Sequence, residues 1–296
     1  MNQGLAGRTY LSIVIPSYNE EQRLGATLET IQAFVDDKKL QAEILVVDDG
    51  SADGTIRLAE GFLRGGRGRV IRNQRNRGKG YSVRHGVLQA SGRWVLITDA
   101  DLSTPIEEYD SLAAVVRNRD LDVAIGSRGL EDSRVEVPQH GLRQFMGRTF
   151  NRIIRIMTGL KYRDTQCGFK LLDRERCLPL FQRMQVERFA FDVEFLFLCQ
   201  RYGLTVAEVP VVWRNDEAST AVAALSEQHQ MMQRDMFGSL YESFEEKYPG
   251  KVRVIPVSAA LIDLMQQFAK GEIAHLTCID EAKRESEVGF YRDGGH

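Results

Sequence analysis

The chain has 296 residues, of which 43% are hydrophobic and 27% are charged, and its formal net charge is −2 at pH 7. This composition is ordinary for a soluble globular protein, and the low net charge argues against a protein built mainly to bind nucleic acid. No run approaches the roughly 18 apolar residues of a membrane span, and residues 1–9 lack the apolar core of a signal peptide, so we expect a cytoplasmic location.

Apolar, β-branched runs of strand length alternate with helical patterns in the first hundred residues. Strands are expected at Leu11–Pro16, Glu43–Val47, Arg69–Ile71 and Trp94–Ile97. Helical periodicity lies between them, for example at Tyr81–Gln89. This alternation is typical of βαβ units. The sequence therefore predicts an α/β fold with a mostly parallel sheet flanked by helices.

Carboxylates follow two of the expected strands directly. Asp99 and Asp101 come after Trp94–Ile97, and Asp48 and Asp49 end the run that begins at Glu43. Ligands of open α/β sheets bind beyond the carboxyl ends of the strands. Carboxylates there can hold a hard divalent cation together with substrate phosphates, or accept hydrogen bonds from a ribose or a base. The G-x-G-x-x-G fingerprint is absent after the first strand, which weakens a dehydrogenase interpretation.

A basic stretch without acids spans residues 61–98 and contains nine Lys or Arg residues. Within it, residues 75–80 read R-N-R-G-K-G. Glycines on both sides of Lys79 let backbone N–H groups and the ammonium approach an anion closely. A solvated basic loop is the alternative interpretation. Together with the carboxylate pair, the loop predicts a nucleoside diphosphate ligand.

A second basic stretch, Leu142–Leu160, interleaves apolar residues with arginines, and no acid occurs between Gly141 and Arg163. The pattern is typical of an interfacial membrane helix, and the alternative is a core helix whose arginines extend into water. A lipid-phosphate ligand would need both features, an apolar surface for its tail and arginines for its head group.

The motifs resemble those of family-2 glycosyltransferases in order and spacing, over roughly residues 10–217. They look most like those of the dolichyl-phosphate or polyprenyl-phosphate β-glucosyltransferases. The resemblance implies a GT-A fold, a UDP-hexose donor with glucose favoured, Mg²⁺ or Mn²⁺, and inversion at the anomeric carbon. The matching segments are residues 16–20 (PSYNE), 47–51 (VDDGS), 76–80 (NRGKG), 99–101 (DAD), 126–128 (GSR), 164–170 (DTQCGFK) and 191–194 (FDVE).

The same resemblance implies roles for individual residues. The uridine of the donor would be lined by Pro16, Tyr18, Glu20 and Asp49, with Asp48 close behind. The diphosphate would face Lys79, and the metal and ribose would lie between Asp99 and Asp101, the latter also a catalytic candidate. The positions that grip an acceptor phosphate correspond to Arg128 and Arg143, and Arg128 is a catalytic candidate as well. Arginine suits this task because its planar fork binds phosphate oxygens bidentately.

The chemistry of the acceptor decides whether a general base is needed. A phosphate monoester is largely ionised near pH 7, with a second pKa of about 6, so its oxygen can attack without one. A hydroxyl acceptor would need a base, and the candidates are Asp192 and Glu194. Either carboxylate could instead orient an arginine or a lysine. The two share a face if the segment is extended and diverge if it is helical.

We therefore predict an inverting hexosyltransferase that uses a UDP-hexose donor and a lipid-phosphate acceptor, as a peripheral protein at the cytoplasmic membrane face. Two alternatives stay open. One is a family-2 glycosyltransferase with a soluble or polysaccharide hydroxyl acceptor, and the other is a non-catalytic protein that binds nucleotide sugars.

Two domains are predicted, a GT-A domain over residues 1–220 and an appended, helix-rich C-terminal segment of unknown role over residues 221–296. The last six residues, YRDGGH, are similar to the Asp-x-x-His block that closes SGNH-type hydrolases. The Gly-Asp-Ser nucleophile block of those hydrolases is absent from the whole chain. Without the serine this block cannot carry out acyl transfer.

Overall fold

A computed structural model describes residues 9–135, 158–214, 275–276 and 290–291. Its centre is a seven-stranded sheet in the order β3-β2-β1-β4-β7-β5-β8, in which β7 runs antiparallel to both neighbours and the other pairs are parallel. The predicted mostly parallel sheet is thereby confirmed. The strands are β1 (Leu11–Ser17), β2 (Ala42–Asp48), β3 (Gly68–Arg72), β4 (Trp94–Ile97), β5 (Val123–Ser127), β7 (Lys170–Asp173) and β8 (Val206–Pro210).

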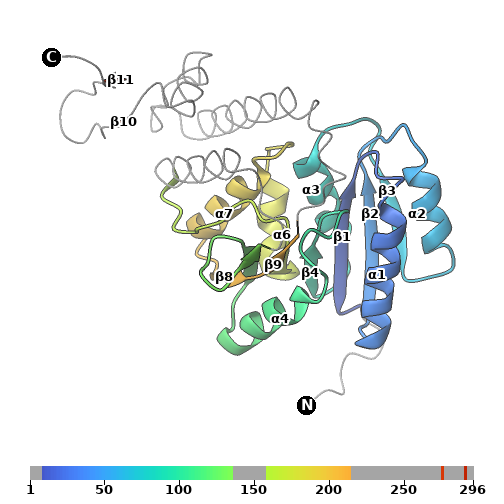
Figure 1. The fold of residues 1–296 in the computed structure, drawn as a ribbon, viewed down its shortest axis with the longest axis horizontal. Helices are drawn as coiled ribbons and strands as arrows, with labels where there is room; N and C mark the ends of the chain where they lie inside the picture. The colour runs from blue at the N-terminus through green and yellow to red at the C-terminus, as the bar shows by residue number, and fades with distance from the viewer. Residues whose placement is uncertain (1–8, 136–157, 215–274, 277–289, 292–296) are drawn as a thin grey trace.

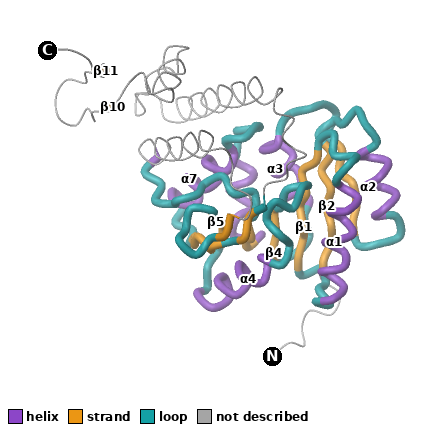
Figure 2. Tube along the Cα trace, in the orientation of Figure 1, coloured by secondary structure: helices purple, strands orange, loops and turns teal. Residues whose placement is uncertain are grey.

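Helices cover both faces of this sheet (Figures 1 and 2). One apolar core joins the sheet to α1 (Leu24–Asp37), α2 (Thr55–Leu63) and α4 (Glu108–Arg119). A second core joins it to α3 (Lys79–Gln89), α6 (Arg174–Arg183) and α7 (Phe191–Arg201). The two cores share the strands because successive strand residues point to opposite faces.

The buried strands are apolar on both faces, as strands covered by helices on each side must be. In β1, Ile13 packs toward α1 and Val14 packs toward α3, and both are fully buried. In α1 the buried residues Leu24, Leu28 and Ile31 recur at helical spacing and form the face that meets the sheet. The apolar pattern of the strands and the helical periodicity of α1 thus explain the three layers, a sheet with helices on both faces.

The four strands expected before residue 100 are confirmed, and no end differs from its expected position by more than one residue. Strands β5 and β7 were not predicted. The apolar run at residues 206–213 (VAEVPVVW) predicts an edge strand interrupted by Pro210. The structure divides it into β8 and the short β9 (Val212–Trp213), which pairs with β6 (Arg134–Val135). Proline at the end of β8 is tolerated because that strand is outermost in the sheet.

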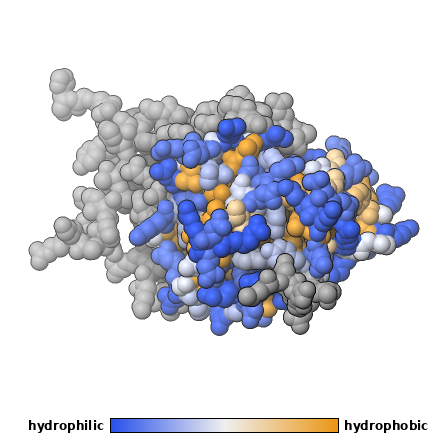
Figure 3. All heavy atoms as spheres, turned by 90° about the horizontal axis from the view of Figure 1, so that it is seen from below, coloured by the Kyte–Doolittle hydropathy of each residue, from blue (hydrophilic) through white to orange (hydrophobic). Residues whose placement is uncertain are grey.

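Most of the predicted basic helix at residues 142–160 and most of the C-terminal segment lie outside the described residues. In the latter, β10 (His275–Leu276) pairs antiparallel with β11 (Phe290–Tyr291). The described part of the chain contains no helix long and apolar enough to cross a bilayer. On the face drawn in Figure 3, hydrophilic residues surround smaller hydrophobic areas.

Candidate active site

The predicted carboxylate pair lies in the loop that follows β4, at the carboxyl end of the sheet. Thr27 on α1 donates a hydrogen bond from Oγ1 to the Ala100 carbonyl at 2.6 Å. The backbone N–H of Ser103 donates to Asp101 Oδ1 at 2.9 Å. These bonds fix the loop between Asp99 and Asp101. Strand β1 has neighbours on both sides that come later in the chain, β2 and β4, and a crevice at such a point is where open α/β sheets bind ligands.

The side chain of Asp99 meets both a lysine and a glycine from distant parts of the chain. Lys79 Nζ lies 2.5 Å from Asp99 Oδ1, and the two side chains keep 23% and 31% of their surface exposed. Burial opposes ionisation of Asp99, but the charge and hydrogen bond of Lys79, together with the charges of Lys170 and Arg128, outweigh it and lower the pKa of the carboxyl group. A Cβ at Gly168 would lie 2.2 Å from Asp99 Oδ2, so only glycine permits this approach.

The donor atoms of this site fit a hard divalent cation. Asp99 and Asp101 offer carboxylate oxygens, the ligand type that Mg²⁺ and Mn²⁺ take. Among the described residues no group of three or more His, Cys, Asp or Glu could hold a metal by itself. Waters and substrate phosphates would therefore have to complete the coordination shell, as is usual for Mg²⁺.

The loop that leads to Lys79, the first residue of α3, is attached to the carboxylate of Asp49. Asp49 Oδ1 accepts hydrogen bonds from Arg77 N at 3.0 Å and from Asn73 Nδ2 at 2.8 Å. Asp49 Oδ2 accepts from Gly78 N at 2.7 Å. Gly78 has φ of 105°, a conformation that favours glycine. These contacts give Asp49 a role in shaping the loop, and its predicted contact with uridine stays a prediction.

Asp48, at the end of β2, makes different hydrogen bonds from Asp49. It is fully buried, and its Oδ2 accepts hydrogen bonds from Gly50 N and Ser51 N at 3.0 and 3.1 Å. Its Oδ1 is buried and has no hydrogen-bond partner among the described residues. A buried carboxylate oxygen without a partner is costly, so this atom fits an N–H donor of a bound base.

The remaining donor-site candidates lie around the end of β1. Pro16 is half-buried within that strand, and the side chain of Tyr18 is 47% exposed just beyond it. Glu20 accepts a hydrogen bond from Arg23 Nε at 2.7 Å. Burial raises the pKa of Glu20, and the nearby charges of Asp99 and Asp101 act in the same direction. Glu20 therefore belongs to the same electrostatic environment as the carboxylate pair.

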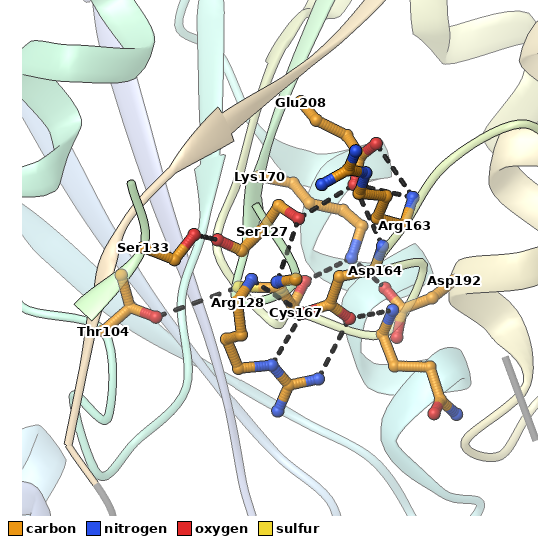
Figure 4. Close-up of polar contacts among 12 residues, drawn as sticks. Thr104, Ser127, Arg128, Ser133, Arg163, Asp164, Cys167, Lys170, Asp192 and Glu208 are labelled. Atoms are coloured by element: carbon orange, nitrogen blue, oxygen red, sulfur yellow. Dashed lines mark hydrogen bonds and ion pairs between the residues drawn. The ribbon is translucent and has the colours of Figure 1, made fainter. Parts of the chain in front are cut away.

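Arg128 follows β5 and forms a two-pronged ion pair with Asp164 (Figure 4). Its Nε and Nη2 donate to the two carboxylate oxygens at 2.6 and 3.0 Å. Asp164 is 3% exposed. Burial disfavours the charged forms, but their mutual attraction lowers the pKa of Asp164 and raises that of Arg128. The guanidinium also lies 5.6 Å from the ring centroid of Trp213.

A second, more deeply buried pair joins β7 to α7. Lys170 Nζ lies 2.5 Å from Asp192 Oδ1 and also donates to the Cys167 carbonyl (Figure 4). Lys170 is 1% and Asp192 4% exposed. Burial raises the pKa of Asp192, although Lys170 and Lys79 act against this. Asp192 therefore lies within the electrostatic reach of the lysine that pairs with Asp99.

The two predicted base candidates, Asp192 and Glu194, both lie in α7. Because the segment is helical, Asp192 and Glu194 diverge. Glu194 is 3% exposed and accepts hydrogen bonds from the backbone N–H groups of Gln185 and Val186 at 2.9–3.1 Å. These contacts favour the orienting alternative for Glu194, and its catalytic role stays a prediction.

The structure brings Lys79, Asp99 and Asp192 together, and Arg128 acts electrostatically on Asp99. Arg143, the second acceptor-phosphate candidate, lies outside the described residues. Asp164 and Lys170 were not among the predicted site residues. Both lie in the segment DTQCGFK, which the resemblance had already marked, but their ion-pair partners are 36 and 22 residues away.

Comparison with known proteins gives consistent matches. The glycosyl transferase family 2 model matches residues 12–178. Dolichyl-phosphate beta-glucosyltransferase of Drosophila melanogaster is 37% identical over 222 residues, which cover 71% of this chain and 68% of the relative.

Solved structures share the fold. Mannosyl-3-phosphoglycerate synthase of Rubrobacter xylanophilus superposes with a TM-score of 0.63 at 18% identity, covering 97% of this chain and 87% of that one. Glucosyl-3-phosphoglycerate synthase of Mycobacterium tuberculosis, crystallised with Mn²⁺, UDP and glucosyl-3-phosphoglycerate, gives 0.57 at 20% identity, with 80% of each chain covered. With its GT-A fold and its extensive sequence match, the chain belongs to glycosyl transferase family 2.

Proposed function

We propose that this protein transfers glucose from UDP-glucose to a polyprenyl or dolichyl phosphate, with inversion at the anomeric carbon. The main support for the proposal is the contact between Lys79 Nζ and Asp99 Oδ1, which lie 2.5 Å apart beyond the carboxyl end of β4. A cation-binding carboxylate and a phosphate-binding lysine at one point suit a nucleoside diphosphate. The named relative supports the choice of sugar and acceptor.

On this proposal, Asp48 and Asp49 take the nucleoside end of the donor and Lys79 takes the diphosphate. Asp99 and Asp101 would hold Mg²⁺ or Mn²⁺, which would neutralise charge on the departing UDP as a Lewis acid. Lys79 lies beside Asp99 and contributes positive charge at the same place. Electrostatic stabilisation aimed at a developing charge usually contributes most to such catalysis.

The acceptor would be held by Arg128 together with Arg143. An oxygen of the acceptor phosphate attacks the anomeric carbon of glucose, the bond from that carbon to the β-phosphate oxygen breaks, and UDP leaves with the electron pair. Attack from the face opposite UDP gives inversion. The acceptor oxygen is already ionised near pH 7, given a second pKa of about 6, so Asp192 is not required as a general base.

A lipid acceptor places the reaction at a membrane surface. We propose peripheral binding at the cytoplasmic face. The basic, apolar stretch at residues 142–160 would supply the contact with lipid.

The test is release of UDP from UDP-glucose by the purified protein with Mn²⁺, with and without a short polyprenyl phosphate. We expect release only with the lipid, and a loss of at least about 100-fold in Asp101→Ala, since removal of one stabilising group from such a site costs this much. Asp37→Ala, an exposed acid at the end of α1, is the matched control and should keep full activity.

Other outcomes separate the alternatives. Turnover with a sugar hydroxyl and none with the lipid phosphate would favour a hydroxyl acceptor and a base at Asp192. Binding of UDP-glucose without turnover on any acceptor would favour the non-catalytic nucleotide-sugar-binding protein.

A further inference from the structure

The loop that leads to Lys79 and the first turn of α3 are packed against a segment more than a hundred residues later, Gln185–Arg188, which lies between α6 and α7. A Cβ at Gly78 would lie 2.7 Å from the Glu187 carbonyl oxygen. A Cβ at Gly80 would lie 2.6 Å from the Val186 carbonyl oxygen and 2.7 Å from that of Arg188. The two glycines that flank Lys79 are therefore in direct contact with this backbone.

Polar contacts reinforce the packing. The N–H of Tyr81 donates to the Glu187 carbonyl at 2.8 Å. Arg77 Nε donates to Glu187 Oε2 at 3.2 Å, and the two side chains form an ion pair. On its other side the loop is held by Asp49, which accepts from Arg77 N and Gly78 N. The position of Lys79 thus depends on both Asp49 and the segment Gln185–Arg188.

This segment depends in turn on a single buried carboxylate. Glu194 Oε1 and Oε2 accept from Gln185 N at 3.0 and 3.1 Å, and Oε2 accepts from Val186 N at 2.9 Å. Hydrogen bonds from backbone N–H groups to an ionised carboxylate are stronger than those between neutral groups. Glu194 is 3% exposed, so water cannot readily replace it as the acceptor.

We infer that Glu194 is a positioning residue for Lys79: its carboxylate fixes Gln185 and Val186, and that backbone fixes the phosphate-binding loop. The inference rests on the proposed function only in taking UDP as the ligand that Lys79 faces. A general base must reach the proton it removes, whereas both oxygens of Glu194 are engaged with backbone amides.

The first test is hydrogen exchange at residues 76–81 in Glu194→Gln. The amide of glutamine keeps the size of the side chain but turns an N–H₂ group toward backbone donors, so we expect exchange at residues 76–81 and 185–188 to become faster. Asp122→Asn is the matched control. Asp122 is also a buried acid that accepts from a backbone N–H, that of Thr205 at 2.8 Å, but it precedes β5 at the opposite end of the sheet.

The second test compares the affinities for UDP and for uridine, measured by NMR titration with diamagnetic Mg²⁺ present. In Glu194→Gln we expect about a tenfold weaker affinity for UDP, the scale of one lost charge-assisted contact, and an unchanged affinity for uridine, which has no phosphate for Lys79. Asp122→Asn should change neither affinity. The shape of the pH profile of kcat should be the same in Glu194→Gln and in the unaltered protein.

Three results in Glu194→Gln would overturn the inference. The first is unchanged hydrogen exchange at residues 76–81, and the second is an equal loss of affinity for UDP and for uridine. The third is an unchanged affinity for UDP together with an altered pH profile of kcat, which would make Glu194 a base. If the unaltered protein bound no UDP, the proposed donor would be wrong, and hydrogen exchange would still decide whether Glu194 positions the loop.

Discussion

Asp164 is a buried carboxylate that stays ionised because Arg128 supplies two side-chain donors and one backbone donor to it. Replacement of one partner of a buried pair is costly because the other charge is left without compensation, commonly by about 3–5 kcal/mol. The side chain of Arg128 is 31% exposed, so water compensates part of that loss. The pair therefore couples the predicted acceptor-binding arginine to the stability of the fold.

We expect Asp164→Asn to lower the free energy of unfolding by about 2–3 kcal/mol at pH 7. The pKa of Asp164 is lowered in the folded state from its ordinary value of 3.8. Its stabilising contribution is therefore present in full above pH 3.8 and is lost as the pH falls through the folded-state pKa. Urea denaturation at pH 7 and at decreasing pH should show the difference between the two proteins becoming smaller in acid.

The control for this measurement is Asp110→Asn. Asp110 pairs with Lys38 on the surface, where the side chains are 51% and 42% exposed. Exposed pairs contribute about 0–1 kcal/mol, so the control should change stability little. A loss in Asp164→Asn that stays constant down to strongly acidic pH would contradict an electrostatic role for the pair.

At the scale of elements, the turn before β7 approaches the loop after β4 at Gly168. Both segments are anchored, since β7 pairs with β4 throughout residues Lys170–Asp173. A methyl group at Gly168 would meet the carboxylate of Asp99 at 2.2 Å and has no space unless that side chain moves. The turn before the antiparallel strand therefore limits where the carboxylate of Asp99, the proposed metal ligand, can lie.

We expect Gly168→Ala to lower kcat/KM by about 100-fold, the effect of a misplacement of about 1 Å in an active site. Steady-state assays of UDP release, together with thermal unfolding, would measure this. Gly61→Ala is the control, because Gly61 lies in α2 and no side chain or backbone beyond its own helical turn lies within 4 Å of its Cβ position. It should keep full activity and gain up to about 1 kcal/mol in stability. Full activity in Gly168→Ala would show that the Asp99 carboxylate need not stay where it lies.

At the scale of the whole molecule, the described candidate site residues all precede residue 215. We therefore expect a chain shortened to residues 1–220 to bind UDP with Mn²⁺ within about twofold of the full chain. Calorimetry would measure the affinity, and circular dichroism would establish that the shortened chain is folded. A folded chain with no UDP affinity would place donor contacts in residues 221–296 and would make the proposed domain boundary wrong.

The strands before residue 100 were predictable from sequence because their signals are local. The residue at which an apolar strand run ends can be read from the sequence. Carboxylates that directly follow such a run in a parallel sheet lie at its carboxyl end. Strands β5 and β7 were harder to predict because they lie beyond the regular strand–helix alternation of the first hundred residues. Without that context, a short apolar run does not distinguish strand from helix. The antiparallel direction of β7 follows from the way it pairs with β4 and β5 and has no signature in its own residues.

The family, the order of the motifs and the placement of Asp48, Asp49, Asp99 and Asp101 at strand ends follow from the amino-acid sequence alone. The partner that each charged group takes is set by the tertiary structure. Packing directs Asp192 toward Lys170 and Glu194 toward backbone amides, and it places Gly168 against Asp99. The hydrophobic periodicity of the sequence specifies single helices and strands over a few residues. These partners are far apart in the sequence and are brought together only when the two layers of helices pack on the sheet.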